Sequence, residues 1–415
     1  MVQVQYLVVG SSHAALEAID AIRMHDQEGS LALVTRDDRL PYSPTVLPYI
    51  VSGRSAPDNV QLRQAEYFSQ RGVSCTFGRA LVRIEPKRNV ATLSDGIEIA
   101  YDKLLLATGA APALPPIPGI EAIPYHVLRT IDDALRLKAA IALARRAIVL
   151  GGGLIGMHAA ENLVRAGVDV TIVEKEPYLL SAYFDATAGT IIERTFLERG
   201  ARIMTGRSVI QATPHGCGAR LQLNDGEILD ADLLLLAVGA RPDIGYLADT
   251  AVVYDAGIIV DDSMRTSVAN IWAAGDCAQG RDFFSEGAVL NSILPDAAEQ
   301  GRLAGMAMAG DSAIKSYAGA VPLNTYGFFG RHAISVGTTP AGAEELVRHD
   351  EPGGRYLRLV VKNRRLQGIF GVNEFFDGGI MRQLILRRVD VSDALDRLFG
   401  DPQTAGRELM SRLWR

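Results

Sequence analysis

The stretch AIVLGGGLIGMHAAENLVRAGVDVTIVEK, residues 147–175, decides the fold of this chain. An apolar strand pattern runs into Gly151, Gly153 and Gly156, an amphipathic helix pattern follows, and a second apolar strand pattern ends at Glu174. This order predicts a dinucleotide-binding unit. The first glycine makes the tight turn, the second lets backbone N–H groups approach a pyrophosphate, and the third lets helix pack closely on strand.

Glu174 stands where a carboxylate accepts hydrogen bonds from the ribose hydroxyls of the nucleotide. A phosphate at that place would be repelled, so we expect NADH to be preferred over NADPH. The residues expected to contact NAD in this unit are Gly151, Gly153, Leu154, Ile155, Gly156, Glu174 and Lys175.

A second fingerprint opens the chain in YLVVGSSHAALEAIDAIR, residues 6–23, where Gly10, Ser12 and Ala15 take the three glycine positions. The strand LALVT then ends at Thr35, where an acid is usual. We therefore expect the adenosine ribose contact in this copy to come from Asp37 or from backbone groups.

Three more segments follow a fixed order around the second fingerprint: LLLATGA at 104–110, LLLLAVGARPD at 233–243 and IWAAGDCA at 271–278. The whole order resembles the FAD/NAD-linked pyridine nucleotide–disulfide oxidoreductase superfamily, over nearly the full chain. By position, the resemblance implies NAD contacts at Val238 and Gly239. The FAD contacts that it implies are Gly10, Ser12, Ala15, Pro44, Thr45, Thr108, Gly109, Gly275, Asp276, Leu294 and Ala297. The helix that opens at Leu294 would point its N-terminus at the flavin pyrimidine, where its dipole favours negative charge.

The resemblance implies an α/β fold with two Rossmann-like dinucleotide-binding domains and a C-terminal α+β interface domain. A Pro-rich connector, AAPALPPIPG at 110–119, marks the first boundary. The expected domains are an FAD domain at 1–112, an NAD domain at 113–243, a return to the FAD domain at 244–315, and the interface domain at 316–415.

Composition narrows the class of protein. The 415 residues are 48% hydrophobic and 22% charged, with a net charge of −6, which argues against a nucleic-acid binder. No apolar run approaches the ~20 residues that span a bilayer. The histidines lack metal-ligand spacing, and Cys75, Cys217 and Cys277 form no CxxC, so we expect no metal site. The first strand begins at about Val4, which leaves no room for a signal peptide, and a cytoplasmic location is expected.

The segment RLPYSPTVLPYIVSG, residues 39–53, is where the disulfide-reducing branches of the superfamily carry a redox cysteine. Alignment on Leu47-Pro48-Tyr49 places Thr45 at that position, and threonine cannot carry electrons. Ferredoxin and rubredoxin reductases have a lysine–glutamate pair at the positions of Tyr49 and His158. Either these two residues form a replacement polar contact where nicotinamide meets flavin, or His158 is a helix residue bonded locally. We favour the second interpretation, in which His158 is not an acid or base of the reaction, because hydride transfer does not require a side-chain acid.

The predicted function is an FAD-dependent NADH:acceptor oxidoreductase that exchanges electrons with an iron–sulfur subunit or a ferredoxin-like carrier. The segments PYSPTVLPYIVSG and GGGLIGMHAAENLVRAG resemble FAD subunits of NAD-linked multi-subunit oxidoreductases, such as the tungsten aldehyde oxidoreductases and the phenylglyoxylate dehydrogenases. The chain would then reduce NAD+ within a hetero-oligomer. The alternatives are a stand-alone ferredoxin or rubredoxin reductase, and a flavoprotein interaction or sensing module with slow NADH oxidation.

The iron–sulfur partner is expected on the flavin side away from the nicotinamide, against the FAD and C-terminal domains. The aromatic residues that would contribute to that surface are Tyr326, Phe328, Phe329, Phe375 and Phe376. Most of them are expected in the core, and a remaining exposed cluster would suit a protein interface.

Overall fold

The computed structural model describes residues 2–412 and divides into two compact units. Unit 1 comprises residues 1–43, 58–111 and 241–321, and unit 2 comprises residues 44–57, 112–240 and 322–415. The predicted α/β class is confirmed. A two-stranded sheet of β7 (Ala110–Pro112) and β15 (Ala240–Pro242) lies at two of the places where the chain passes from one unit to the other.

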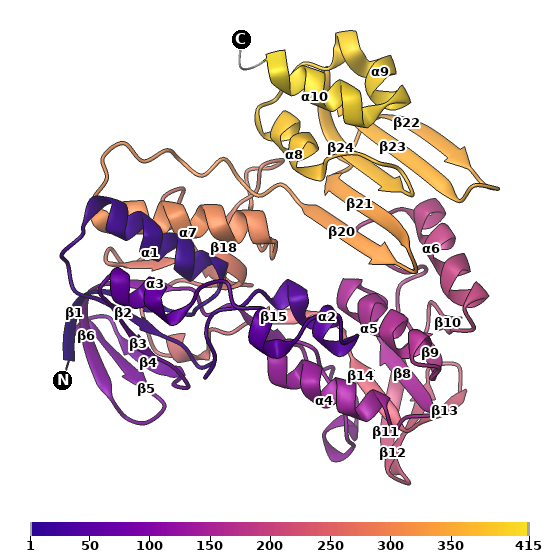
Figure 1. The fold of residues 1–415 in the computed structure, drawn as a ribbon, viewed down its shortest axis with the longest axis horizontal. Helices are drawn as coiled ribbons and strands as arrows, with labels where there is room; N and C mark the ends of the chain where they lie inside the picture. The colour runs from indigo at the N-terminus through magenta and orange to yellow at the C-terminus, as the bar shows by residue number, and fades with distance from the viewer. Residues whose placement is uncertain (1, 413–415) are drawn as a thin grey trace. The chain divides into compact units, whose positions relative to one another are not determined.

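Unit 1 is built on one sheet with the strand order β3-β2-β1-β6-β5-β4, and β17 pairs with β6 (Figure 1). The parallel strands are β1 (Val2–Val9), β2 (Leu31–Val34), β3 (Val73–Thr76), β6 (Glu98–Leu106) and β17 (Ile271–Ala273). The register aligns Val9 with Val34 and Leu106, and Leu106 with Ala273. The carboxyl ends of these strands therefore meet at one edge of the sheet, which is where open α/β sheets bind their ligands.

Two helices pack together in unit 1, α1 (His13–His25) and α7 (Leu294–Ala309), as Figure 1 shows. A Cβ at Gly301 would meet the carbonyl oxygen of Ala14 at 2.1 Å, and one at Gly305 would meet that of Ala18 at 2.4 Å. Glycine at these two positions therefore lets the helix backbones touch. The remaining elements of this unit are α3 (Ala65–Gln70), β16 (Ile258–Ile259), β18 (Ala278–Arg281), β19 (Ala288–Val289), and the 3₁₀ helices η4 (Gly245–Leu247) and η5 (Gly275–Cys277).

Strands and helices no longer alternate after β3. There β4 (Leu81–Glu85), β5 (Val90–Leu93) and β6 form an antiparallel meander with no helix between them. Asn89 and Gly96 have positive φ angles of 54° and 85° in the two connecting turns, so the local turn chemistry closes hairpins here.

Unit 2 contains a second parallel sheet, with the order β10-β9-β8-β14. Its strands are β8 (Arg146–Leu150), β9 (Asp169–Val173), β10 (Arg202–Met204) and β14 (Leu233–Leu236), and its helices are α4 (Ile131–Ile141), α5 (Leu154–Arg165) and α6 (Ala186–Glu198). Two hairpins form a three-stranded antiparallel sheet of β11 (Val209–His215), β12 (Gly218–Leu223) and β13 (Ile228–Ala231). Helix α2 (Leu47–Val51) belongs to the same unit.

The C-terminal part of unit 2 is an antiparallel sheet with the order β20-β21-β24-β23-β22. Its strands are β20 (Leu323–Phe328), β21 (Arg331–Gly337), β22 (Glu344–Asp350), β23 (Arg355–Lys362) and β24 (Arg365–Val372), followed by α8 (Gly378–Leu386), α9 (Leu395–Gly400) and α10 (Pro402–Arg412). Strand β22 was missed by the sequence patterns. Its burial alternates only weakly along a charged segment, as an edge strand allows.

The tip of the β20–β21 hairpin packs on helices α5 and α6, which connect strands of the parallel sheet of unit 2. The Phe329 ring lies edge to face with that of Phe196 at 4.9 Å, and the guanidinium of Arg165 lies 5.2 Å from the Phe329 ring centre. The backbone N–H of Phe329 donates to the buried carboxylate of Glu161 at 2.8 Å. Aromatic packing and a charge-assisted hydrogen bond thus hold the hairpin against α5 and α6.

Candidate functional site: two glycine turns

The turn after β1 requires glycine at its first position. Gly10 has φ 114°, and a Cβ there would meet the carbonyl oxygen of Ala107 at 2.0 Å. Ser12 is the N-cap of α1 and makes no side-chain cap bond, while Ala15 is fully buried against the sheet. The first-turn N–H groups of α1 therefore have no side-chain cap from Ser12 and can bind an anionic group.

Two further segments meet α1 at this sheet edge. A Cβ built on Gly275 would lie 3.3 Å from that of Ala14 and 3.8 Å from that of Ala297. The first turns of α1 and α7 thus lie beside the start of η5, which carries Asp276. Leu294, at the start of α7, is exposed. These contacts bring together the expected FAD residues of three distant sequence segments.

The turn at Gly275 is held by a residue that sequence reasoning missed. The backbone N–H of Gly275, a residue with φ 79°, donates to Oε1 of Gln300 at 2.8 Å. Gln300 lies in α7 and is 3% exposed. No local pattern joins positions 25 residues apart, so only the tertiary contact shows this role.

Thr108 and Gly109 follow β6 at the same edge. The Thr108 hydroxyl donates to the carbonyl oxygen of Asp243 at 2.9 Å and lies 2.9 Å from the Tyr246 hydroxyl. Gly109 has φ 71°. Thr108 therefore fixes the loop that returns from residue 240, and its contact with FAD remains a prediction.

The site of the usual adenosine ribose acid is occupied by a small hydroxyl network. Thr35 is 5% exposed, and its hydroxyl oxygen lies 3.1 Å from that of Ser11. The Asp37 carboxylate accepts from the Tyr42 hydroxyl at 2.6 Å and from the backbone N–H of Arg39. Asp37 is thus hydrogen-bonded within the protein, and both the Asp37 contact and the backbone alternative for the ribose remain predictions.

His13, in the first turn of α1, is half-buried and lies 2.9 Å from the Ser43 hydroxyl through Nε2. Burial lowers the pKa of His13, and Arg63 lowers it further, while the nearby Asp276 raises it. A neutral imidazole at neutral pH therefore stands beside the expected pyrophosphate turn.

The NAD fingerprint shows the three glycine roles separately. Gly151 has φ 108°, and a Cβ there would meet the carbonyl oxygen of Ala237 at 2.4 Å. A Cβ on Gly156 would meet the carbonyl oxygen of Gly151 at 2.0 Å, so helix and turn are in contact. A Cβ on Gly153 would meet nothing within 4 Å, which leaves open space at the start of α5. That open position fits a pyrophosphate approaching the helix N-terminus.

The Glu174 carboxylate is 9% exposed and is aimed back at this turn. It accepts the backbone N–H of Gly152 at 2.5 Å and that of Glu176 at 2.8 Å.

The other residues expected to contact NAD lie near the ends of the strands of this sheet. Leu154 and Ile155 open α5, and Ile155 is 43% exposed. Val238, 38% exposed, and Gly239, with φ 108°, follow β14 at the same sheet edge. The next residue after Glu174, Lys175, is largely exposed and lies 3.6 Å from Glu176.

Tyr49 and His158 both lie in unit 2, yet no hydrogen bond joins their side chains within residues 2–412. The Tyr49 ring is 44% exposed, and the guanidinium of Arg54 lies 5.4 Å from its centre. The His158 ring meets Tyr326 edge to face at 4.8 Å. Burial lowers the pKa of His158, with Glu161 opposing the shift and Arg54 adding to it. His158 is therefore packed against Tyr326 with a lowered pKa, and its role at the nicotinamide remains a prediction.

Pro44 and Thr45 lie in a 3₁₀ turn (Pro44–Val46) that runs into α2, and they group with unit 2. The carbonyl oxygen of Pro48 accepts from Nδ2 of Asn162, a residue of α5 that sequence reasoning did not single out. This bond holds α2 on the helix of the NAD fingerprint. The contacts of Pro44 and Thr45 with FAD remain predictions.

The cysteines are poorly suited to thiolate chemistry. Burial raises the pKa of Cys75 to about 11, and it also raises the pKa of the fully buried Cys277. Cys217 is exposed between β11 and β12. None of the three is disulfide-bonded. Within residues 2–412 no group of three or more His, Cys, Asp or Glu side chains could hold a metal ion, and no helix is long and apolar enough to cross a membrane.

Residues 4–307 match the pyridine nucleotide-disulphide oxidoreductase family. The chain belongs to this family. It is 56% identical over 414 residues to the NADH-dependent phenylglyoxylate dehydrogenase subunit epsilon of Aromatoleum evansii, covering 99% of this chain and 98% of the relative. It is 30% identical to rhodocoxin reductase of Rhodococcus erythropolis, covering 91% and 88%. A solved ferredoxin reductase from Rhodopseudomonas palustris superposes with a TM-score of 0.82 at 26% identity, covering 89% and 91%.

The family and the similar proteins establish the cofactors and the class of reaction. The protein is an FAD- and NAD(H)-dependent oxidoreductase, as the sequence predicted. When bound, FAD exchanges a hydride with NAD(H) and single electrons with one-electron carriers. We expect the protein's own contribution to be binding and orientation, through glycine turns and helix N-termini for the two pyrophosphates and through the Glu174 carboxylate for the ribose.

Proposed function

We propose that this chain is the flavin-bearing, electron-transfer subunit of an NAD-linked multi-subunit oxidoreductase. It takes electrons from an iron–sulfur subunit and reduces NAD+. The oxidised substrate is a 2-oxoacid of the phenylglyoxylate type, and its chemistry occurs on other subunits. The observation that carries this proposal is the 56% identity to the phenylglyoxylate dehydrogenase subunit, which extends over both chains almost completely.

The position of Thr45 and the raised pKa values of two cysteines support an external electron partner. Thr45 stands at the redox-cysteine position, and the raised pKa values of Cys75 and Cys277 keep these thiols protonated at neutral pH. A thiol relay through this chain is therefore disfavoured. Flavin is suited to join a two-electron nicotinamide to one-electron clusters, so an iron–sulfur protein is the partner class that this chemistry favours. The three unpaired cysteines are compatible with the reducing cytoplasm, which we propose as the location.

A stand-alone ferredoxin or rubredoxin reductase is the second candidate. It is favoured by the 30% identity to rhodocoxin reductase over 91% of this chain. The two functions differ in what the isolated chain can do, since a stand-alone reductase needs no companion subunits.

The test compares the isolated chain with the complex assembled from the subunits that co-purify with it. We expect the isolated, FAD-loaded chain to oxidise NADH with a viologen dye but to show no phenylglyoxylate-dependent NAD+ reduction. The assembled complex should show that activity. Rapid NADH bleaching of the flavin would exclude a slow sensing module. Failure of any companion subunit to co-purify, with full ferredoxin reduction by the chain alone, would favour the stand-alone reductase.

A further inference from the structure

The loop between β9 and α6, residues 174–185, packs on the glycine turn that follows β8. The backbone N–H of Leu180 donates to the carbonyl oxygen of Gly152 at 3.0 Å. A Cβ built on Gly152 would lie 2.5 Å from Cδ2 of Leu179. Leu179 and Leu180 are both buried. This β9–α6 loop therefore covers the middle residue of the three-glycine turn.

Both backbone polar groups of Gly152 are held by hydrogen bonds. Its N–H donates to Oε2 of Glu174 at 2.5 Å, and its carbonyl oxygen accepts from Leu180. The other oxygen of Glu174, Oε1, accepts the N–H of Glu176 at 2.8 Å. The β9–α6 loop therefore holds both the glycine turn and the acid that follows β9.

Leu180 adopts a backbone conformation that is unfavourable for a residue with a side chain. Its φ angle is 56°, in the left-handed region that glycine occupies easily. Its carbonyl oxygen accepts the N–H groups of Tyr183 at 2.8 Å and Phe184 at 3.1 Å. A conformation of this kind persists only where surrounding contacts hold it, so the bond from Leu180 to Gly152 depends on the contacts of the loop.

Glu193 provides such a contact from α6. Its Oε1 atom accepts the backbone N–H of Leu179 at 3.0 Å, and the residue is half-buried. A Cβ built on Gly189 of α6 would lie 3.1 Å from the carbonyl oxygen of Leu179, so helix and loop are in contact. Because Leu179 directly precedes Leu180, two successive backbone N–H groups connect Glu193 with the carbonyl oxygen of Gly152.

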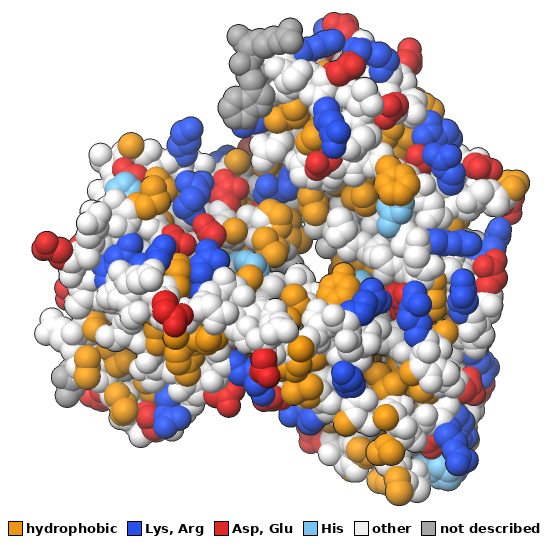
Figure 2. All heavy atoms as spheres, in the orientation of Figure 1, with side chains coloured by type: hydrophobic (Ala, Val, Ile, Leu, Met, Phe, Trp, Pro, Cys, Tyr) orange, Lys and Arg blue, Asp and Glu red, His pale blue; other side chains and the backbone are white. Residues whose placement is uncertain are grey.

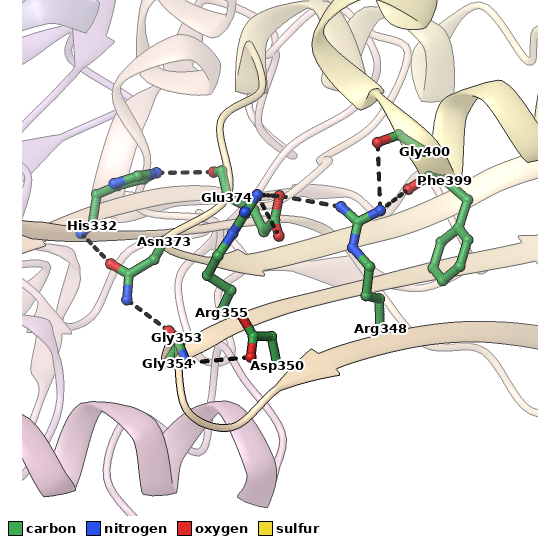
Figure 3. Close-up of polar contacts among 10 residues, drawn as sticks. All are labelled: His332, Arg348, Asp350, Gly353, Gly354, Arg355, Asn373, Glu374, Phe399 and Gly400. Carbon is green, nitrogen blue, oxygen red and sulfur yellow. Dashed lines mark hydrogen bonds and ion pairs between the residues drawn. The ribbon is translucent and has the colours of Figure 1, made fainter.

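Helix α6 is itself anchored to the C-terminal sheet. Nη1 of Arg331 in β21 donates to Oγ1 of Thr195 in α6 at 2.9 Å. A Cβ built on Gly354, in the turn between β22 and β23, would lie 3.8 Å from Cγ2 of Ile191 in α6. Figure 3 shows how this turn is held, with Nδ2 of Asn373 donating to the carbonyl oxygen of Gly354 at 2.7 Å. The helix that carries Glu193 is therefore fixed on the sheet.

Most of the aromatic residues expected at a docking surface lie inside the C-terminal part. The ring of Phe329 packs on that of Phe196 in α6. Phe375 is 77% exposed and follows Glu374, whose buried carboxylate pairs with two arginines (Figure 3). The buried members of the set are Tyr326, Phe328 and Phe376. The expected exposed cluster is therefore a single ring, and a partner surface there remains a prediction.

Surface charge is mixed on the face drawn in Figure 2, where Lys and Arg side chains are interspersed with Asp and Glu side chains. A broad field of one sign would act on NADH and NADPH alike, because both carry the pyrophosphate. The two nucleotides differ only in the phosphate on the 2′ oxygen. We therefore expect local groups beside the ribose to discriminate between them.

We propose that Glu193 is a positioning residue for the nicotinamide nucleotide. Through Leu179 and Leu180 it holds the carbonyl group of Gly152. The N–H of Gly152 in turn holds the Glu174 carboxylate at the expected ribose contact. Glu193 thereby sets both the affinity for NADH and the discrimination against NADPH. This inference deepens the proposed function, since it rests on NAD binding at the turn after β8, but it needs no iron–sulfur partner.

The test uses the full-length, FAD-loaded chain with a viologen dye as electron acceptor, and compares NADH with NADPH. E193A removes the acceptor of the Leu179 N–H and should raise the KM for NADH about three- to tenfold, the range for one lost hydrogen bond. The kcat should stay within about twofold, because substrate and transition state lose the same binding. The preference for NADH in kcat/KM should fall by a similar factor. E193Q keeps an acceptor oxygen and should restore both values.

E198A is the matched control, because Glu198 is an exposed glutamate and the last residue of α6. It removes the same charge from the same helix and should leave the KM and the nucleotide preference unchanged. A double-mutant cycle with E174A tests the route of the effect. If Glu193 acts through the turn on Glu174, E193A should change the nucleotide preference by less than about twofold in the E174A background.

An E193A chain with unchanged KM and nucleotide preference would overturn the positioning role, even if its melting temperature falls. Additive effects of E193A and E174A on the preference would also overturn it, because Glu193 would then act independently of Glu174. E193D keeps the charge but shortens the reach of the side chain, so it provides the same comparison if E193A folds poorly. Absence of phenylglyoxylate-dependent NAD+ reduction in the assembled complex would contradict the proposed function alone and leave this inference standing.

Discussion

The carboxylate of Glu174 accepts the backbone N–H of Gly152 at 2.5 Å, so the acid at the end of β9 is held over the glycine turn after β8. A Cβ on Gly152 would lie 3.2 Å from the same Oε2 atom, which shows how closely turn and acid approach. These contacts fix the side chain, and we expect it to lie where a nucleotide 2′-hydroxyl or 2′-phosphate is discriminated.

We expect E174A to weaken the preference for NADH over NADPH. The change removes the acceptor for the ribose hydroxyls and the repulsion of a 2′-phosphate, and a hydrogen bond to a charged group contributes roughly 1.5–3 kcal/mol, or about 10- to 100-fold in kcat/KM. The measurement is kcat/KM for both nucleotides with a viologen acceptor. Equal use of both nucleotides by the unmodified protein would contradict this assignment.

Variants of Gly156 and Gly153 can separate an effect on folding stability from an effect on NADH binding. G156A should destabilise unit 2 by several kcal/mol, because its Cβ would lie 2.0 Å from the carbonyl oxygen of Gly151 and force α5 away from the turn. G153A should leave the melting temperature almost unchanged, since its Cβ meets nothing within 4 Å, but should raise the KM for NADH by filling the open position. Thermal unfolding and NADH kinetics on both variants check the pair. Equal melting temperatures for the two variants would show that the helix can move away cheaply.

These roles could be predicted because they are local. Glycine spacing, the apolar strands and the closing acid lie within 29 residues, and each acts on its chain neighbours, so pattern and geometry correspond closely. The order of the later segments then indicated both cofactors and the two sheets.

What the sequence did not show depends on contacts between distant segments. The Gln300 side chain accepts the N–H of Gly275, which lies 25 residues earlier in the chain. The ring of Tyr326, in the C-terminal β20–β21 hairpin, packs edge to face on the ring of His158 in α5. Neither contact leaves a periodic signal. Nor does the sequence say which of five aromatic residues escapes the core, since that depends on the cross-strand ties of Glu374.

We expect the protein to need no thiol for electron transfer. A C75S/C217S/C277A variant should keep its NADH-to-dye rate within about twofold, with a small stability loss of about 1 kcal/mol from the cavity at buried Cys277. Steady-state rates and FAD content report the two effects separately. Loss of activity after alkylation of exposed Cys217, with FAD retained, would contradict this expectation.

His158 should make folding stability depend on pH. Its pKa is lowered in the folded protein, chiefly by burial, so the unfolded chain binds more protons once the pH falls towards the unfolded value of about 6.5. The contribution of neutral, buried His158 to the free energy of unfolding is therefore present at higher pH and is lost as the pH falls. Urea unfolding at about pH 7.5 and about pH 5.5 should show a smaller acid loss for H158Q than for the unmodified protein. His13 and His126, whose pKa values are also lowered, remain in both proteins as a common background. An equal acid loss in both would show that His158 is solvated.

Gln300 should be needed to retain FAD. Its Oε1 atom accepts the N–H of Gly275, and truncation to Ala would leave that donor unpaired and loosen the turn that carries Asp276. We expect Q300A to release FAD about tenfold more readily, which corresponds to ~1.4 kcal/mol. The matched control is Q279A, because Gln279 is also buried in unit 1 and accepts the N–H of a glycine, Gly257, at 3.1 Å. Both variants should lose similar stability, but only Q300A should lose flavin, as measured by the absorbance of bound FAD during dilution. Equal flavin loss in the two variants would mean that general loosening of unit 1, rather than the Gly275 turn, controls FAD binding.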